Sequence, residues 1–453
     1  MTKTFIPIPL RASYTLRNAN LPACLVKMPE AMLFAPSQEI VKADILIDEG
    51  RIAAISPAGT AAPESGPDVD GALLMPGMID CHAHLDKAHI APRAPNTNGD
   101  FAGAALANNE DRSVRWTAAD VRRRMEFGLL SASAHGVVAI RTNLDCHDRQ
   151  ASITLPVFCD LREEWSGRLE LQANALLPLQ AFLADGAVEL VNRVAELEGS
   201  IGSVLKAKSS SGSRSVENAR EALTRLFRLA AERGLDVDLH VDETDDRDSR
   251  MLAEVANIAV QEKFQGTVTC SHCCSLALQP QGVVDRTLDA LSAAGISIVC
   301  LPTVNMYLQS RAIGRTPTWR GVTLIHEMKA RGLRVAVAGD NCRDVFHAYG
   351  DHDMLDTFSQ AVKILHLDHP FGDWIKTATA APAEIMRMDG SFGVLAVGRK
   401  ANLILTRARN YSELHSRPQS DRIVLRNGKP IDTTLPDYRL LDDLMRPLSR
   451  NEL

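Results

Sequence analysis

The sequence predicts an α/β fold: a (β/α)8 TIM barrel with a small β-sandwich domain formed from both termini. The middle of the chain alternates short apolar segments with longer amphipathic stretches, which is typical of strand–helix units around a parallel sheet. The two ends instead contain short alternating segments separated by turn residues. The 453 residues, of which 45% are hydrophobic, suffice for one large barrel and an accessory domain.

Eight candidate barrel strands follow one another along the chain. Between the fourth and the fifth, Ser215 is a candidate N-cap, an apolar stripe includes Ala222 and Leu226, and Gly234 ends the predicted helix. Eight strands spread over about 310 residues match a TIM barrel. The predicted strands are residues 73–79, 137–142, 169–176, 203–207, 236–241, 267–271, 297–301 and 335–338.

The sequence predicts antiparallel strands at both ends of the chain. Residues 43–55 alternate in polarity around a turn at 48–51, which indicates a β-hairpin. Residues 401–405 and 423–426 show the same pattern, and an Asn-Gly turn follows at 427–428. Neither end has enough strands to bury a sheet alone, so we expect one sandwich built from both. The predicted domains are residues 1–73 and 389–453 for the two parts of the sandwich and 74–388 for the barrel.

Composition predicts a soluble cytoplasmic protein. The formal net charge of −6 gives no reason to expect nucleic acid or an anionic membrane as a partner, and Arg122–Arg124 read as a solvated helix face. The first ten residues do not resemble a signal peptide, and no apolar segment reaches the roughly 18 residues that cross a bilayer. The nine cysteines fall mostly in apolar segments, which suits reduced, buried thiols better than disulfides.

Histidines and acids end several of the apolar strands. His82 and His84 follow the first strand and point the same way in an extended segment, because side chains alternate with period two. The others are His240 and Glu243 after the fifth strand, His272 after the sixth and Asp340 after the eighth. The carboxyl ends of barrel strands meet at one face, so we expect these groups to lie together. Such a set of ligands suits Zn²⁺, and also Fe²⁺ or Mn²⁺ if one position stays open for water.

These motifs resemble those of the amidohydrolase superfamily along nearly the whole chain. Residues 75–80 before the His-x-His pair look like the family's strand-one signature, and residues 393–403 look like its sandwich signature. Within the superfamily the chain resembles the cytosine deaminase branch, and also N-isopropylammelide hydrolase. That likeness rests on residues 84–87 (His-Leu-Asp-Lys), His240-x-x-Glu243 and residues 304–311.

The resemblance implies a mechanism with one divalent metal ion, zinc or iron, with manganese as a further option. Such an ion lowers the pKa of bound water toward about 7. His272 and Asp340 would orient or deprotonate that water. Glu243 would carry a proton from the water to a ring nitrogen and then to the departing amine. The implied metal ligands are His82, His84, His240 and Asp340.

Four positions depart from the cytosine deaminase pattern and are the predicted substrate-binding residues. Leu179 stands where the family has a glutamine, and Gln180 comes one residue late. Asn341 replaces a second aspartate, and Phe346 replaces a tryptophan. Sites that hydrogen-bond a substrate discriminate strongly, so these changes put cytosine itself in doubt.

The resemblance therefore implies a hydrolytic deaminase, acting on C–N bonds other than peptide bonds in a small cytosine-, pterin-, creatinine- or triazine-type heterocycle. It also implies a homo-oligomer. Lys206 and Lys208 leave open a ring-opening cyclic amidohydrolase of the dihydroorotase or hydantoinase kind, because binuclear members carry a carbamylated lysine after strand four. A catalytically inactive scaffold is the third alternative, and the four intact ligands argue against it.

Other histidines and cysteines have no role that the sequence assigns. The run Cys270-Ser271-His272-Cys273-Cys274 could be read as a structural zinc knuckle, but it lacks the second ligand pair. The histidines without an assigned role include His89, His135, His147, His347 and His352.

Overall fold

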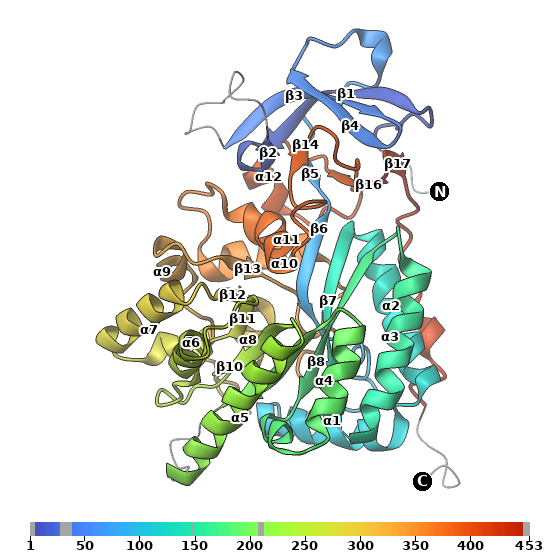
Figure 1. The fold of residues 1–453 in the computed structure, drawn as a ribbon. Coiled ribbons are helices and arrows are strands. Elements are labelled where there is room, and N and C mark those ends of the chain that lie inside the picture. The colour runs from blue at the N-terminus through green and yellow to red at the C-terminus, as the bar shows by residue number, and fades with distance from the viewer. Residues whose placement is uncertain (1–4, 28–38, 147, 207–212, 447–453) are drawn as a thin grey trace. The chain divides into compact units, whose positions relative to one another are not determined.

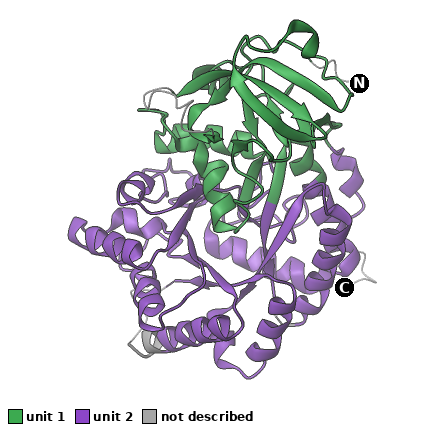
Figure 2. Ribbon diagram, turned by 45° about the horizontal axis from the view of Figure 1, so that its top comes forward, with its two compact units in different colours: residues 1–80, 130–139, 353–435 green, residues 81–129, 140–352, 436–453 purple. Residues whose placement is uncertain are grey.

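The computed structural model describes residues 5–27, 39–146, 148–206 and 213–446. The chain forms two compact units (Figure 2). Unit 1 comprises residues 1–80, 130–139 and 353–435, and unit 2 comprises residues 81–129, 140–352 and 436–453. The predicted domain limits at residues 73 and 388 stay a prediction.

An eight-stranded sheet with the order β13-β12-β11-β10-β9-β8-β7-β6 confirms the predicted barrel (Figure 1). Its two end strands meet around Asp340, whose backbone N–H donates to the His82 carbonyl at 2.8 Å, while the His84 N–H donates to the Asp340 carbonyl at 3.2 Å. The strands are β6 (Met78–Ala83), β7 (Val137–Asp145), β8 (Glu170–Leu177), β9 (Ser200–Leu205), β10 (Asp236–Val241), β11 (Val268–His272), β12 (Ser297–Cys300) and β13 (Val335–Val337).

Helices alternate with the barrel strands as predicted (Figure 1). The helix expected between strands four and five is α5 (Ser213–Glu232), and its Ala222 and Leu226 are fully buried. The side chain of Ser215, the candidate N-cap, lies outside the described residues. The others are α1 (Phe101–Arg115), α2 (Ala118–Ala134), α3 (Ala151–Trp165), α4 (Ala187–Glu196), α6 (Met251–Gln261), α7 (Gln281–Ala293), α8 (Pro302–Leu308), α9 (Ile325–Ala330), α10 (Met354–Leu365), α11 (Ala380–Ile385) and α12 (Tyr411–Ser416).

The first predicted strand is in fact two strands with different partners. β5 (Leu74–Pro76) pairs antiparallel with β15 (Leu403–Leu405), and the barrel strand β6 begins only at Met78. Gly77 separates them, and a Cβ on this residue would lie 2.2 Å from Val138 Cγ1, so only glycine fits. His82 consequently lies inside a barrel strand rather than after it. The fourth barrel strand, β9, also begins three residues before the predicted position 203.

Strands from both ends of the chain share one hydrophobic core in unit 1, as predicted. Leu16 and Ile45 from the N-terminal part belong to the same buried cluster as Leu403 and Leu425 from the C-terminal part. The small sheets have the orders β1-β3-β4, β17-β16-β15-β5 and β14-β2. Their remaining strands are β1 (Ser13–Pro22), β2 (Val26–Lys27), β3 (Ile40–Asp48), β4 (Arg51–Pro57), β14 (Leu395–Ala396), β16 (Ile423–Arg426) and β17 (Lys429–Pro430).

Two further findings concern thiols and membranes. All nine cysteines lie among the described residues and are free thiols. Among the described residues, no helix has the length and apolar character needed to cross a bilayer. The cytoplasmic location stays a prediction.

Candidate active site

Unit 2 brings the predicted metal ligands and His272 into one buried cluster. His82 lies on β6, and His84 follows that strand by one residue. His240 on β10 and His272 at the end of β11 lie on neighbouring strands, because Val241 pairs with His272 in the parallel register. Asp340 lies just past β13, where the barrel closes. None of the five residues is more than 5% exposed.

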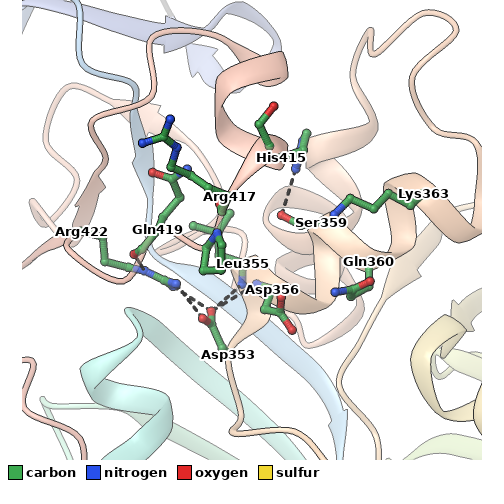
Figure 3. Close-up of a pocket in the computed structure, with 12 residues that line it drawn as sticks. Asp353, Leu355, Asp356, Ser359, Gln360, Lys363, His415, Arg417, Gln419 and Arg422 are labelled. Carbon is green, nitrogen blue, oxygen red and sulfur yellow. Dashed lines mark hydrogen bonds and ion pairs between the residues drawn. The ribbon is translucent and has the colours of Figure 1, made fainter.

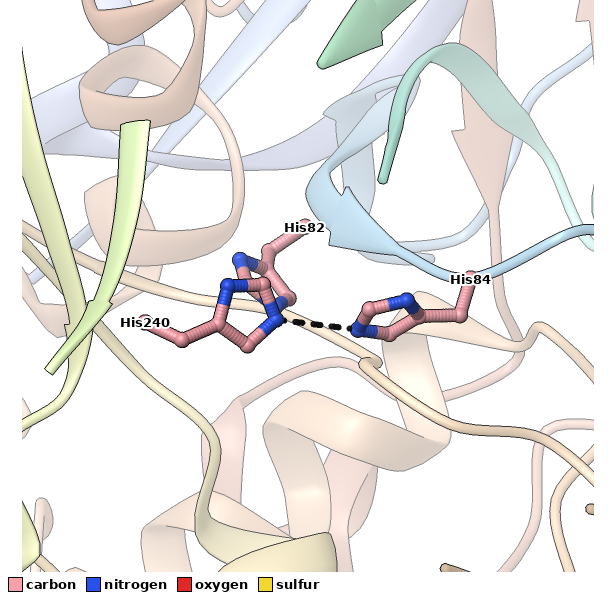
Figure 4. Close-up of side chains that lie close together, drawn as sticks. All are labelled: His82, His84 and His240. Carbon is pink, nitrogen blue, oxygen red and sulfur yellow. Dashed lines mark hydrogen bonds between the residues drawn. The ribbon is translucent and has the colours of Figure 1, made fainter. Parts of the chain in front are cut away.

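The nitrogen and oxygen atoms of this cluster converge closely. His84 Nε2 and His240 Nε2 are 3.1 Å apart (Figure 4). Asp340 Oδ1 lies 3.3 Å from His84 Nε2 and 3.5 Å from His82 Nε2. The ring centroids of His82 and His240 are 4.5 Å apart, and those of His240 and His272 are 5.0 Å apart.

The donor atoms fit a divalent metal ion. Two groups of three residues each place one donor atom per residue within 4.8 Å of the others. The first group is His82, His84 and His240, and the second is His82, His272 and Asp340. Neither carboxylate oxygen of Asp340 accepts a hydrogen bond from the described residues, although the side chain is fully buried. Burial raises the pKa of Asp340 to about 8. A cation in contact with this carboxylate removes the cost of leaving its charge buried without a partner.

The histidines are held in the neutral form that binds metals. Burial lowers the pKa of His82 to about 4. Burial also lowers the pKa values of His84, His240 and His272 well below their usual range, and neighbouring positive groups add to the effect. Because a neutral imidazole offers a lone pair, these histidines are ready to bind a cation near neutral pH.

Glu243 lies beside the cluster with a carboxyl that can exchange protons near neutral pH. Its Oε1 is 3.6 Å from His272 Nδ1, and its Oε2 is 3.8 Å from Lys206 Nζ. Burial raises the pKa of Glu243 to about 7, although the charge of Lys206 acts in the opposite direction. A group with this pKa can accept and return a proton in one reaction cycle.

The four predicted substrate-binding residues are placed differently from one another. Asn341 is buried, and its Nδ2 donates to Asp344 Oδ2 at 2.5 Å. Phe346 is half-buried, with its ring 5.4 Å from Phe101 and 5.5 Å from Lys87 Nζ. Leu179 is buried at the start of a 3-10 helix, η5 (Leu179–Leu183), whereas the adjacent Gln180 is exposed. Their binding roles stay a prediction.

Several polar residues around the cluster carry structural interactions that the sequence did not reveal. Lys87 is buried with its Nζ 3.1 Å from Asp145 Oδ1. Burial alone lowers the pKa of Lys87, but Asp145, Asp86 and other carboxylates raise it above its usual value. Asn305 Nδ2 lies 3.0 Å from His272 Nδ1, so with the amide donating, the His272 proton is on Nε2. The signal that the sequence offered for Lys87 and Asn305 was their position within the motifs at residues 84–87 and 304–311.

The expected solvated helix face at Arg122–Arg124 was wrong for Arg124. This residue is fully buried, and its guanidinium donates to Asp120 Oδ2 at 2.7 Å and to the backbone carbonyl of Ala88 at 3.2 Å. Three adjacent arginines on a helix point in different directions, so their charge alone did not predict which one faces inward.

The structure also contains a pocket that is separate from the cluster around Asp340. It lies wholly within unit 1, and its lining includes Asp353, Ser359, Lys363, His415 and Arg422 (Figure 3). Arg422 forms a double ion pair with Asp353, with N–O distances of 2.7 and 2.6 Å. None of the predicted site residues lines this pocket.

Comparison with known proteins agrees with the fold and the site. The family model described as "Amidohydrolase family" matches residues 93–431, a range that includes His240, His272 and Asp340 and begins after His82 and His84. The chain therefore belongs to the amidohydrolase family. It is 47% identical to a pterin deaminase of Rhizobium rhizogenes over 450 residues, which cover 98% of this chain and 100% of that one.

Solved structures share the fold. A 5-methylcytosine deaminase from Klebsiella pneumoniae superposes with a TM-score of 0.78 at 23% identity, covering 94% of this chain and 98% of that chain. An N-isopropylammelide isopropylaminohydrolase from Burkholderia multivorans superposes with a TM-score of 0.71 at 22% identity, covering 93% and 98%. These likenesses confirm the predicted TIM-barrel fold.

Proposed function

We propose that the chain is a metal-dependent hydrolytic deaminase whose substrate is a pterin-type heterocycle. The observation that carries the proposal is the buried cluster of His82, His84, His240 and Asp340 with Glu243 beside it. The substrate class is supported by the 47% identity, over nearly the full length of both chains, to a protein named pterin deaminase. Pterins are among the heterocycles that the sequence motifs imply.

In this proposal, His82, His84, His240 and Asp340 hold the ion. A divalent cation supplies Lewis-acid activation of water at neutral pH. His272 orients the water through Nε2. Glu243 takes one proton from the water and delivers it to the ring nitrogen next to the attacked carbon. The water oxygen forms a bond to that carbon, and Glu243 takes the second proton from the resulting hydroxyl group. Glu243 then delivers this proton to the exocyclic amine, the C–N bond breaks, and ammonia leaves as the hydroxyl oxygen becomes a carbonyl.

The environment of Lys206 favours this reaction over ring opening. Its Nζ lies 3.8 Å from the Glu243 carboxylate and 2.9 Å from the centroid of the Phe101 ring. Both contacts favour the ammonium form and act against burial, which lowers the pKa of Lys206. A carbamylated lysine would instead bring a negative charge to the Glu243 carboxylate. Lys208 lies outside the described residues. A catalytically inactive scaffold is disfavoured by the complete set of donor groups.

Aromatic rings suit a flat substrate. Phe346 and Phe101 lie with their centroids 5.4 Å apart, near Lys87 and Lys206. In the proposed complex these rings contact the face of the heterocycle, and Asn341 donates a hydrogen bond to its edge. Leu179 and Gln180 complete the predicted lining. Zinc or iron is the proposed metal, with manganese as a further option, in a cytoplasmic homo-oligomer.

The test is ammonia release from pterin, cytosine, creatinine and aminotriazine by protein loaded separately with Zn²⁺, Fe²⁺ and Mn²⁺. We expect ammonia from pterin with at least one metal, and no ammonia from the His82→Ala variant with the same metal. Ammonia from another ring but not from pterin would overturn the substrate assignment. Metal-loaded protein that releases no ammonia from any of the four would overturn deamination and favour ring opening.

A further inference from the structure

A second group of metal-binding side chains lies in unit 2, made of His89, Cys342 and His352. One nitrogen or sulfur atom from each lies within 4.8 Å of the others, and all three residues are buried. None of them belongs to the cluster around Asp340. We propose that these residues form a second, structural metal site that binds Zn²⁺.

His89 gives the independent observation that points to a ligand. Its side chain is 1% exposed, and neither ring nitrogen has a hydrogen-bond partner among the described residues. Buried polar atoms are rarely left in this state, because each lost hydrogen bond costs free energy. Burial, with the charges of Arg343 and Arg124 adding to it, lowers the pKa of His89, so the ring is neutral and offers a lone pair.

The donor types and spacing suit zinc. Two imidazole nitrogens and one thiolate are among the preferred ligands of Zn²⁺, which accepts water as the fourth. Tetrahedral bonds of about 2.0–2.3 Å place neighbouring donor atoms about 3.3–3.8 Å apart. The three donor atoms lie within 4.8 Å of one another, so side-chain rotations of modest size can bring them to this spacing. The ring centroids of His89 and His352 are 5.6 Å apart. Binding displaces the thiol proton of Cys342 into solvent.

The surrounding backbone is shaped around the three side chains. His89 and His352 have left-handed φ values of 65° and 53°, which non-glycine residues adopt uncommonly. The His89 N–H donates to the Cys342 carbonyl at 3.1 Å, so two separate loops are joined at the site. On α2, a Cβ at Gly128 would lie 2.9 Å from His352 Nε2, so the glycine leaves room for this ring.

The position of the site suggests what the ion does. Cys342 lies two residues after Asp340, and His89 lies five residues after His84. A metal ion bound by His89 and Cys342 therefore ties together the two loops that carry predicted ligands of the catalytic ion. It fixes those loops without contacting the substrate.

Metal content and cobalt spectroscopy test the proposal without measuring activity. After removal of bound metal and reconstitution with zinc, we expect two equivalents of zinc per chain in the wild type, one in Cys342→Ala, and two in the matched control Cys300→Ala, which removes another buried thiol. Protein made in cobalt-supplemented medium should show a near-ultraviolet sulfur-to-cobalt charge-transfer band from a Cys342–cobalt bond. The cluster around Asp340 contains no sulfur ligand and therefore cannot produce this band. The band should persist in His240→Ala and vanish in Cys342→Ala.

Cobalt-loaded wild-type protein without this band would overturn the second site, even if the Cys342→Ala variant fails to fold. A band that persists in Cys342→Ala would overturn it equally. The deaminase proposal is unaffected by either result, because its own test is ammonia release.

Discussion

At the scale of single residues, the carboxyl of Glu243 connects the metal-binding cluster to its surroundings. Its two oxygens lie 3.6 Å from His272 Nδ1 and 3.8 Å from Lys206 Nζ, and burial raises its pKa to about 7. The group is thus poised between its charged and neutral forms at physiological pH. Two predictions follow from this position.

Replacing the carboxyl by an amide removes proton transfer and keeps the shape of the side chain. We expect Glu243→Gln to lower kcat about 10²–10⁴-fold while metal content stays that of the wild type. Steady-state ammonia release and metal analysis measure the two quantities. Glu262→Gln, on the surface of the same unit, is the control and should keep its activity. An active Glu243→Gln enzyme would remove Glu243 from the mechanism.

The positive charge of Lys206 should set the pH range of activity. This charge lowers the pKa of Glu243, so Lys206→Met should raise it. Glu243 must start as a carboxylate to accept a proton, so the acid limb of kcat/KM against pH should move up by about one pH unit. Lys206→Arg keeps the charge and should keep the limb near its wild-type position. An unshifted limb in Lys206→Met would show that the limb reports another group.

At the scale of elements, the junction at Gly77 depends on close packing. A Cβ there would lie 2.2 Å from Val138 Cγ1 and 3.1 Å from the Gly136 carbonyl oxygen. We expect Gly77→Ala to lower the free energy of unfolding by about 1–3 kcal/mol, because the added methyl overpacks a rigid contact. Urea denaturation measures the change. Gly390→Ala adds a methyl with nothing within 4 Å and should leave stability nearly unchanged.

His415 on α12 should make unit 1 less stable in acid. Burial lowers its pKa to about 4, with Lys363 adding to the effect. The unfolded chain, with a His pKa near 6.5, therefore binds the proton more tightly, and stability falls as pH drops from about 6.5 toward about 4. This residue alone accounts for a loss of about 2 kcal/mol by about pH 5.

The variant His415→Phe should flatten that dependence. The new ring can keep the stacked contacts with Phe371 and Tyr411, although the hydrogen bond to Ser359 is lost. Thermal unfolding at about pH 8 and about pH 5 should show a smaller drop in the variant than in the wild type. An equal drop would assign the acid sensitivity to other groups.

The number and order of the barrel strands could be predicted from the sequence, whereas the residues at which some strands begin could not. Six of the eight predicted barrel strands start within one residue of their observed starts, since apolar segments bounded by turns mark buried strands well. The boundary at Gly77 was missed because residues 73–79 form one apolar run in which two strands differ only in their partners. Which strand a segment pairs with depends on the tertiary structure, and the hydrophobic periodicity of the segment does not indicate it.

The convergence of the site residues could be predicted from sequence, and their surroundings less so. His82, His84, His240 and Asp340 were expected to lie together because strand ends converge in a barrel, and the structure places them together, while their role as metal ligands stays a prediction. The contact of Asn305 with His272 and the burial of Arg124 depend on which way a side chain turns in three dimensions. The group of His89, Cys342 and His352 spans two loops, whose approach no local pattern indicates.

At the scale of the whole molecule, metal binding should stabilise the fold. A ligand at 100 times its Kd adds about 2.7 kcal/mol to the stability of the folded state. We expect chelation to lower the Tm and added Zn²⁺ to restore it, as calorimetry can measure. The shift should be smaller in His82→Ala, which lacks one predicted ligand. If chelator leaves the Tm of metal-loaded protein unchanged, the metal does not bind the folded state more tightly than the unfolded state, which contradicts this prediction.

The backbone hydrogen bonds of Asp340 close the barrel only after most of the chain has been synthesised. His82 and His84 leave the ribosome long before Asp340, whose backbone hydrogen bonds join the first barrel strand to the last. A nascent chain can thus offer an ion only part of the donor set until more than 250 residues beyond His84 have been made. The complete donor set is therefore available only after the last barrel strand has been made, so we expect the ions present around the folding chain at that stage to decide which metal it binds. The growth medium should then alter which ion the purified protein carries.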